Sequence, residues 1–190
     1  DPSDGTRSIS PFLMLSVAAK HQLSLGLEWA CIRTVLKQLQ QLPISMSHLK
    51  ISVNLSALSL MQPDFGEKLC ALLSKENIAK NRLIIEITET NELTVSEEVK
   101  NNFAQIFKHG VGLSLDDFGT GYSSLLLLSS LPISELKLDY AMISNIENPR
   151  FYSTITLSSG AAKDNSAYIV AEGIETEKQR ELLQEIDIKI

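Results

Sequence analysis

Hydrophobic residues follow two alternating patterns along the chain, one typical of buried strands and the other of amphipathic helices. Short hydrophobic runs predict strands at residues 49–54, 83–87, 112–115, 135–138 and 167–171. Hydrophobic residues spaced three and four apart predict helices at residues 28–42, 64–75, 96–109, 150–163 and 176–184. Strands and helices therefore alternate through most of the chain.

The ends of several elements carry their own signals. A helical face at residues 13–18 is expected to break near Gly26, and a short helix is expected to begin near Ser123. Ser96 is a typical N-cap residue, and Gly110 follows the last turn of the same helix. Residues 187–190 resemble the start of a further strand. The sequence thus predicts five strand–helix units.

Each predicted strand is too hydrophobic to have one face in water. Strands buried on both faces are typical of parallel sheets with helical crossovers. The sequence therefore predicts an α/β fold, either an open doubly wound sheet or a closed (β/α) barrel. The chain of 190 residues fits a single domain, which we assign to residues 1–190.

Charge and cysteine content exclude some classes of protein. A net charge of −6 and a pI near 5.1 argue against binding to polymeric nucleic acid or to an anionic membrane, because such proteins present a basic surface. No hydrophobic run approaches the roughly 20 residues of a membrane-spanning helix. Cys31 and Cys70 lie in hydrophobic helical patterns without metal-ligand spacing, so we expect two buried free thiols in a reducing compartment.

The most informative polar residues stand where the predicted strands end. Each lies at or just after the last hydrophobic residue of its strand, and they are Asn54, Glu86, Asp116, Asp117, Lys137 and Glu172. The carboxyl ends of parallel strands meet at one face of a barrel, so these side chains should converge there. Ionisable groups are costly at the ends of buried strands unless they are paired or bind a metal. We therefore predict a functional site at this face.

The types of these residues narrow the chemistry. Carboxylate and amide oxygens without a nearby His or Cys favour Mg²⁺ or Mn²⁺ over zinc. Asp116 and Asp117 could serve two ions, an arrangement that activates water for phosphoester hydrolysis. Lys137 could orient the water, and Glu172 is a candidate general base or a further metal ligand. The alternatives are that single carboxylates cap the following helices and that Lys137 is merely solvated.

Five segments resemble the EAL domain family in their order and spacing. They are NLS at residues 54–56, EITE at 86–89, DDFGTGYSS at 116–124, LKLD at 136–139 and AEGIET at 171–176. The DDFGTGYSS segment is highly specific, whereas its glycines alone would be only a weak signal for a phosphate-binding loop. The resemblance extends from about Ser10 to the end of the chain. The family comprises bacterial cyclic-di-GMP phosphodiesterases, often fused to sensory or GGDEF domains.

The resemblance implies a modified TIM barrel that hydrolyses cyclic-di-GMP to linear pGpG with Mg²⁺ or Mn²⁺, in a two-metal site. It implies that Asn54, Glu86 and Asp116 ligate the first ion. The second ion would be held by Asp116, Asp117 and Glu172. Lys137 would contact the hydrolytic water, and Glu172 would act as its base.

The resemblance also implies roles around the site. Glu89 would hold the loop formed by residues 116–124, and this loop would contribute to a homodimer. Glu175 would lie near the bound guanine nucleotide. The domain would act in the cytoplasm. This would also hold if the domain were part of a protein that is anchored in the membrane.

Two segments of the family are absent from this sequence. The early strand with the Glu-Ala-Leu motif would precede Ser10, and the late strand with Gln-Gly-Tyr would follow Ile190. The barrel is therefore expected to lack its first strands and its last strand–helix unit, and one metal ligand with them. We interpret the sequence as part of a longer polypeptide rather than a truncated relative, because an open barrel exposes hydrophobic strand edges.

Two other functions stay open at this point. Some family members are non-catalytic cyclic-di-GMP receptors, and others bind no nucleotide and act as protein-interaction modules. A receptor does not need a full set of metal ligands and a base. The presence of all six residues at the strand ends therefore favours the enzyme.

Overall fold

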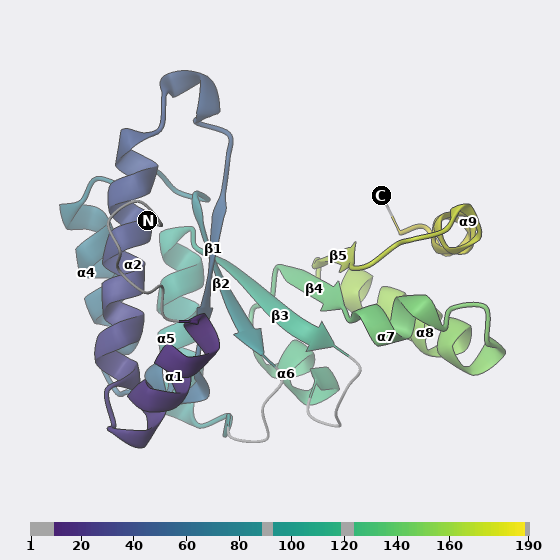
Figure 1. The fold of residues 1–190 in the computed structure, drawn as a ribbon, viewed down its shortest axis with the longest axis horizontal. Coiled ribbons are helices and arrows are strands. Elements are labelled where there is room, and N and C mark those ends of the chain that lie inside the picture. The colour runs from purple at the N-terminus through teal and green to yellow at the C-terminus, as the bar shows by residue number, and fades with distance from the viewer. Residues whose placement is uncertain (1–9, 89–92, 119–123, 189–190) are drawn as a thin grey trace.

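Five parallel strands form one sheet whose spatial order follows the chain (Figure 1). The computed structural model describes residues 10–88, 93–118 and 124–188. The strands are β1 (Ile51–Leu55), β2 (Leu83–Thr88), β3 (Gly112–Phe118), β4 (Glu135–Leu138) and β5 (Tyr168–Ala171). Each strand is parallel to its neighbour, from β1 through to β5. All five strands lie where the hydrophobic runs predict them.

Helices connect the strands and cover the sheet. The longer ones are α1 (Pro11–Lys20), α2 (Ser24–Gln41), α4 (Phe65–Lys75), α5 (Glu97–His109), α6 (Ser124–Ser130), α8 (Pro149–Asp164) and α9 (Glu177–Glu185). Three short elements, which the sequence pattern does not reveal, are η1 (Ile44–Met46), α3 (Ala57–Leu60) and α7 (Tyr140–Ser144). Elements of three to five residues are too short to show a hydrophobic period.

The predicted helix signals are confirmed in one place and wrong in another. Ser96 Oγ accepts a hydrogen bond from the backbone N–H of Val99, and Gly110 ends α5 with a φ of 93°. The expected break near Gly26 is wrong, because α2 begins at Ser24 and continues through the glycine. The interruption lies earlier, where Gln22 has a φ of 56°. A glycine inside a helix costs only about 1 kcal/mol, which the packing of an 18-residue helix can offset.

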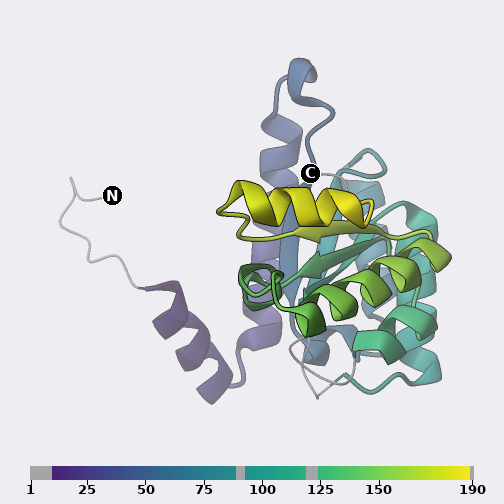
Figure 2. The same ribbon diagram turned by 90° about the vertical axis from the view of Figure 1, so that its right-hand side faces the viewer.

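The last predicted strand is not seen in the described residues. Asp187 and Ile188 follow α9 without strand hydrogen bonding, and residues 189–190 lie outside the described part of the chain. Strands β1 and β5 each pair with one neighbour among the described residues, so the sheet has two edges. Helix α1 contacts α2 and projects away from the sheet (Figure 2). This arrangement is part of a barrel, as predicted.

The two cysteines are free, as predicted, but only one of them is even half-buried. The buried stripe of α2 consists of Ile32, Leu36 and Leu39. Cys31 precedes this stripe by one residue, which turns its side chain by about 100° around the helix and into solvent. Cys70 is partly buried, and its burial raises the pKa of the thiol. The expectation of two buried thiols is therefore wrong.

Asn102 connects α5 by hydrogen bonds to the segment between β1 and α4. Its side chain is 1% exposed, accepts a hydrogen bond from the N–H of Gly66, and donates to the carbonyls of Leu60 and Gln62. Gly66 approaches so closely that a Cβ at this position would lie 2.9 Å from the Asn102 backbone. The segment that follows the Asn54 strand end is thereby fixed in place.

Replacing Asn102 with alanine is expected to destabilise the fold by about 3 kcal/mol, because it leaves buried backbone groups without partners. Urea unfolding, followed by circular dichroism, measures the change. Asn101→Ala, at the exposed neighbouring position of the same helix, is the matched control and should change the stability by less than about 0.5 kcal/mol. Equal effects of the two substitutions would contradict this account.

Among the described helices, none combines the length and the hydrophobicity needed to cross a membrane.

Candidate active site

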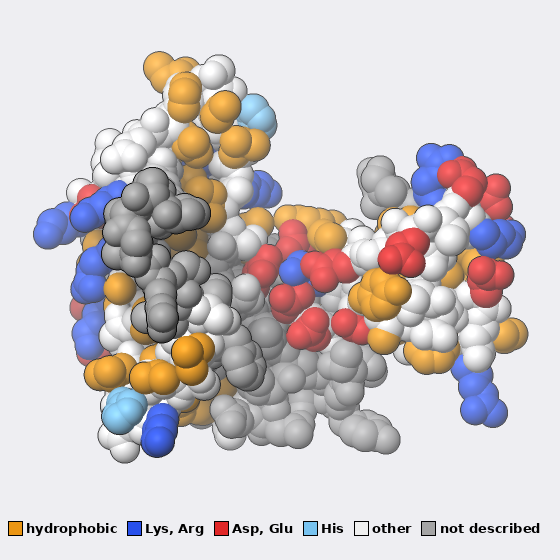
Figure 3. All heavy atoms as spheres, in the orientation of Figure 1, with side chains coloured by type: hydrophobic (Ala, Val, Ile, Leu, Met, Phe, Trp, Pro, Cys, Tyr) orange, Lys and Arg blue, Asp and Glu red, His pale blue; other side chains and the backbone are white. Residues whose placement is uncertain are grey.

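The carboxyl ends of the strands bring predicted site residues together at one end of the sheet, which is the C-terminal face of the barrel. Asn54 of β1 and Glu86 of β2 are direct partners in the register. Lys137 of β4 is the partner of Val170, which stands two residues before Glu172. Figure 3 shows a recess in the middle of the molecule in which acidic side chains surround a basic one. The sequence prediction places its functional site at this same face.

Lys137 lies among three carboxylates from three other strand ends. Its Nζ atom is 2.8 Å from Asp116 Oδ1, 2.8 Å from Glu172 Oε1 and 3.6 Å from Glu86 Oε2. The side chains of Lys137, Glu86 and Asp116 are 14%, 12% and 15% exposed, whereas Glu172 is 42% exposed. The alternative that Lys137 is merely solvated is therefore wrong. Glu172 is the carboxylate of this cluster most open to water.

The surroundings of Lys137 keep it positively charged. Partial burial disfavours the charged form, but hydrogen bonds to Asp116 and Glu172 and the charge of Glu86 outweigh that cost. The pKa of Lys137 is therefore raised above its ordinary value. The cluster therefore consists of the positively charged ammonium of Lys137 and the carboxylates that form ion pairs with it.

A bulge explains how two adjacent aspartates can serve one site. Successive residues of a regular strand point to opposite faces. Between Leu115 and Phe118 the register of β3 against β4 shifts, and Asp117 has a left-handed φ of 55°. The Asp117 N–H donates to Asp116 Oδ1 at 3.1 Å. This irregular backbone re-aims the side chain of Asp117, as bulges beside functional sites often do.

The other charged residues of the cluster alter the pKa of Asp117. Its pKa is raised, first by partial burial and then by the negative charges of Asp116, Asp139 and Glu172, while Lys137 acts in the opposite direction. Asp139 is the acidic residue that the sequence reasoning missed. It also caps α7, because its Oδ1 accepts the N–H of Ala141 at 2.7 Å. Its position directly after β4 is the signal that could have revealed it.

The remaining predicted residues have different positions. Asn54 is exposed and lies beside Glu86 in the sheet. Glu175 is exposed, and its N–H donates to Gln179 Oε1 at 2.7 Å in the capping box of α9. Glu89 lies outside the described residues, as do residues 119–123 of the loop that it was predicted to hold.

A second polar layer lies beneath the cluster on the same face of the sheet. Ser114 Oγ donates to the buried Glu135 Oε1 at 2.7 Å. Partial burial and a hydrogen bond with Glu135 raise the pKa of Tyr168, a residue that is about half exposed, to about 12. Ser114 and Glu135 stand two residues before Asp116 and Lys137, so all four side chains share one face. This buried polar alternation in β3 and β4 departs from the uniformly hydrophobic strands that the sequence predicts.

The donor set fits a hard divalent cation, since carboxylate oxygens already surround one positive group. In residues 10–88, 93–118 and 124–188, no group of three His, Cys, Asp or Glu side chains is arranged to hold a metal ion. Glu86, Asp116 and Glu172 instead lie within ion-pair distance of the ammonium of Lys137.

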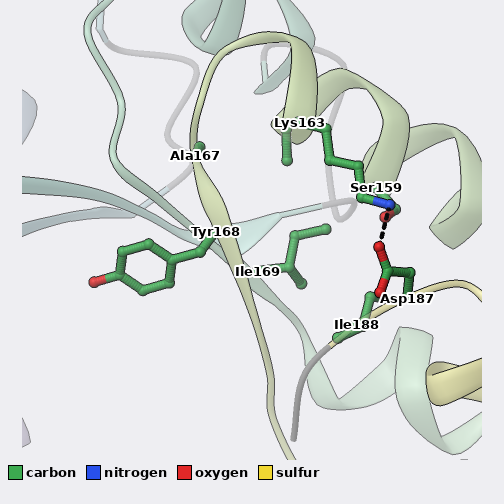
Figure 4. Close-up of a pocket in the computed structure, with 8 residues that line it drawn as sticks. Ser159, Lys163, Ala167, Tyr168, Ile169, Asp187 and Ile188 are labelled. Atoms are coloured by element: carbon green, nitrogen blue, oxygen red, sulfur yellow. Dashed lines mark hydrogen bonds and ion pairs between the residues drawn. The ribbon is translucent and has the colours of Figure 1, made fainter.

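A separate pocket of about 310 Å³ lies between α8, β5 and the segment after α9 (Figure 4). Lys163 and Asp187 form a 2.9 Å ion pair beside it, and the side chains of Tyr168 and Ile169 point to opposite sides of β5. The pocket is at the start of β5, whereas Glu172 follows the end of that strand. It therefore lies away from the acidic cluster.

Comparison with known proteins identifies the family. The sequence model of the EAL domain matches residues 2–190. The chain belongs to the EAL domain family. The resemblance seen in the sequence is thus confirmed.

Two relatives illustrate the similarity in sequence. The chain is 29% identical over 182 residues to the "Probable cyclic di-GMP phosphodiesterase PdeA" of Escherichia coli K12, covering 95% of this chain and 25% of that protein. It is 38% identical over 134 residues to the "Bifunctional diguanylate cyclase/cyclic di-GMP phosphodiesterase MucR" of Pseudomonas aeruginosa, covering 70% of this chain and 20% of that protein. The chain thus spans a quarter or less of the length of these relatives.

A solved EAL structure supports the fold. The structure titled "PaMucR Phosphodiesterase, c-di-GMP complex" superimposes with a TM-score of 0.78 at 32% identity. The superposition covers 95% of this chain and 74% of that chain. The prediction of a partial, modified TIM barrel is confirmed.

Proposed function

We propose that this EAL domain is the catalytic part of a divalent-metal-dependent phosphodiesterase that hydrolyses cyclic-di-GMP to linear pGpG. The observation that carries the proposal is the ion-pair cluster in which Lys137 contacts Asp116 and Glu172. Relatives named for this activity, and a similar structure titled as a cyclic-di-GMP complex, support the choice of substrate. We treat residues 1–190 as one domain, which is consistent with the single sheet.

The metal would be Mg²⁺ or Mn²⁺, held by oxygen donors at the strand ends. The proposed ligands are Asn54, Glu86, Asp116, Asp117 and Glu172. Two such ions, when bound, offset the charge of the phosphate and lower the pKa of a water molecule. Partial burial and the charges of Asp116, Asp139 and Glu172 raise the pKa of Asp117, and a bound cation would relieve this repulsion.

The residues of the chain supply the proton transfer and the orientation. Glu172, partly open to solvent, takes the proton of the water that attacks phosphorus. A new bond forms between the water oxygen and phosphorus, and the bond to the ribose 3′ oxygen breaks. This oxygen leaves and takes a proton from solvent water, and Glu172 then returns its own proton to the solvent. Lys137, permanently charged, holds the attacking water in line and offsets the charge that builds up on phosphate.

Other roles are proposed from the family resemblance. Glu175 would contact the guanine, and Glu89 would anchor the loop at residues 116–124. A homodimer through that loop region and a cytoplasmic site of action are expected on the same basis. A relative described as bifunctional supports fusion to a GGDEF or sensory domain.

Full-length protein is expected to convert cyclic-di-GMP to pGpG with Mg²⁺ or Mn²⁺, and to lose that activity in EDTA, with the product measured by chromatography. Absence of turnover with either metal would overturn the proposal. Tight binding without turnover, measured by calorimetry, would instead identify a receptor. Absence of binding even in Ca²⁺ would identify a protein-interaction module.

A further inference from the structure

An exposed tyrosine stands at the edge of the acidic cluster. Tyr140 is the first residue of α7 and directly follows Asp139, whose charge acts on Asp117. Its side chain is therefore at the carboxyl end of β4, three residues after Lys137. In Figure 3, a hydrophobic surface borders the acidic side chains where Figure 1 places α7. The tyrosine is 49% exposed.

The ring of Tyr140 is held by the turn that carries Glu172. Gly173 follows Glu172 with a left-handed φ of 71°. A Cβ on Gly173 would overlap the Tyr140 Cδ2 atom, so only a glycine allows this approach. Contact with the backbone fixes one side of the ring while half of the side chain faces solvent. A single exposed aromatic residue is common on protein surfaces, so this fixed position beside the cluster is what distinguishes Tyr140.

The same turn presents a carboxylate for a purine base. Glu175 is exposed two residues after Gly173, and its backbone is fixed because Gln179 Oε1 accepts from the N–H groups of Glu175 and Thr176. Gln179 is only 6% exposed, so a buried side chain holds the backbone of the turn. A carboxylate can accept hydrogen bonds from the N1–H and amino groups of guanine, and an aromatic ring stacks on the face of the base. The turn therefore carries the carboxylate, and the ring of Tyr140 on α7, which lies against Gly173 of this turn, supplies the aromatic face.

We propose that Tyr140 is a stacking platform for one guanine of the dinucleotide, the base whose edge Glu175 contacts. The inference rests on the proposed function, because it assumes cyclic-di-GMP as the substrate. Stacking on Tyr140 places the phosphodiester beside Lys137 and Glu172, and it contributes to binding rather than to the chemical step. It names a specificity residue outside the metal and proton-transfer sets.

The test compares Tyr140→Leu with Tyr140→Phe in the full-length protein with Mn²⁺. Leucine keeps a hydrophobic contact with Gly173 but has no aromatic face, whereas phenylalanine keeps the ring. The loss of one stacked base should raise the KM for cyclic-di-GMP about tenfold in the leucine variant. Its kcat should stay within about twofold of the wild type, and the phenylalanine variant should match the wild type in both constants.

Three results separate the possible roles of the ring. An unchanged KM in Tyr140→Leu overturns the proposal, and so does a lower kcat at an unchanged KM, which would mean that the ring only positions Glu172. An NMR contact between the guanine H8 proton and the Tyr140 ring protons, measured in a Ca²⁺ complex of the wild type, tests stacking even where the variant fails to fold. Hydrolysis by the wild type tests the proposed function separately, so the two failures are distinguishable.

Discussion

Replacing Glu172 with glutamine is expected to lower kcat for cyclic-di-GMP hydrolysis about 10³-fold, the typical contribution of a general base. Glutamine keeps the size of the side chain and can still accept a hydrogen bond from Lys137, which Glu172 contacts at 2.8 Å. It cannot take the proton of the attacking water. Steady-state kinetics with saturating Mn²⁺ measure the effect, and calorimetry of Mn²⁺ binding shows how much of it comes from a lost metal ligand.

Glu177→Gln is the matched control for this prediction. Glu177 is an exposed carboxylate in the first turn of α9, where it pairs with Arg180. Its substitution should leave kcat and KM unchanged. If Glu172→Gln kept kcat within tenfold of the wild type while binding metal normally, the base would have to be another residue.

Replacing Lys137 with methionine is expected to destabilise the metal-free protein by about 3 kcal/mol, because it leaves poorly solvated carboxylates without their cation. Asp116 and Glu86 are 15% and 12% exposed and would repel each other without the ammonium. Millimolar Mg²⁺ should restore most of the lost stability, since a ligand that binds only the folded state stabilises it. Urea unfolding in EDTA and in Mg²⁺ measures both values.

Lys163→Met provides the comparison. Lys163 forms a 2.9 Å ion pair with Asp187, but the two side chains are 55% and 77% exposed. Exposed pairs contribute at most about 1 kcal/mol, and Mg²⁺ should not alter this effect. Should Lys137→Met be equally destabilised in EDTA and in Mg²⁺, the cluster would not be the metal site proposed here.

Local sequence was sufficient to predict most of the regular structure. The strand at Glu135–Leu138 and the N-cap at Ser96 depend on hydrophobic runs and on hydrogen bonds between near neighbours. The short helix α7 was not predicted, because five residues show no period and its N-cap, Asp139, was read only as part of a motif. The exposure of Cys31 was mispredicted because a hydrophobic helical pattern was taken to mean burial, although Cys31 lies beside the stripe of Ile32, Leu36 and Leu39 rather than in it.

The residues of the candidate site can also be separated into those predicted from the sequence and those that only the structure revealed. The chain order of acidic strand ends was enough to predict that Glu86, Asp116 and Glu172 share one face, since parallel strands place their carboxyl ends together. Asp117 was also predicted from the sequence, but only the structure shows the bulge and the left-handed backbone through which two consecutive side chains can serve one site. Tyr140 required the structure, since no pattern along the chain relates it to Gly173.

The sequence by itself determined the family, the parallel α/β architecture and the identity of the polar residues at the strand ends. These follow from motifs and from periods of two and 3.6 residues, which are local properties of the chain. Only the tertiary structure decided that Lys137 pairs directly with Asp116 and Glu172 and that a polar layer with Glu135 lies beneath them. The physical reason is that charges interact through space, and the distances between strands depend on their register and on the bulge in β3.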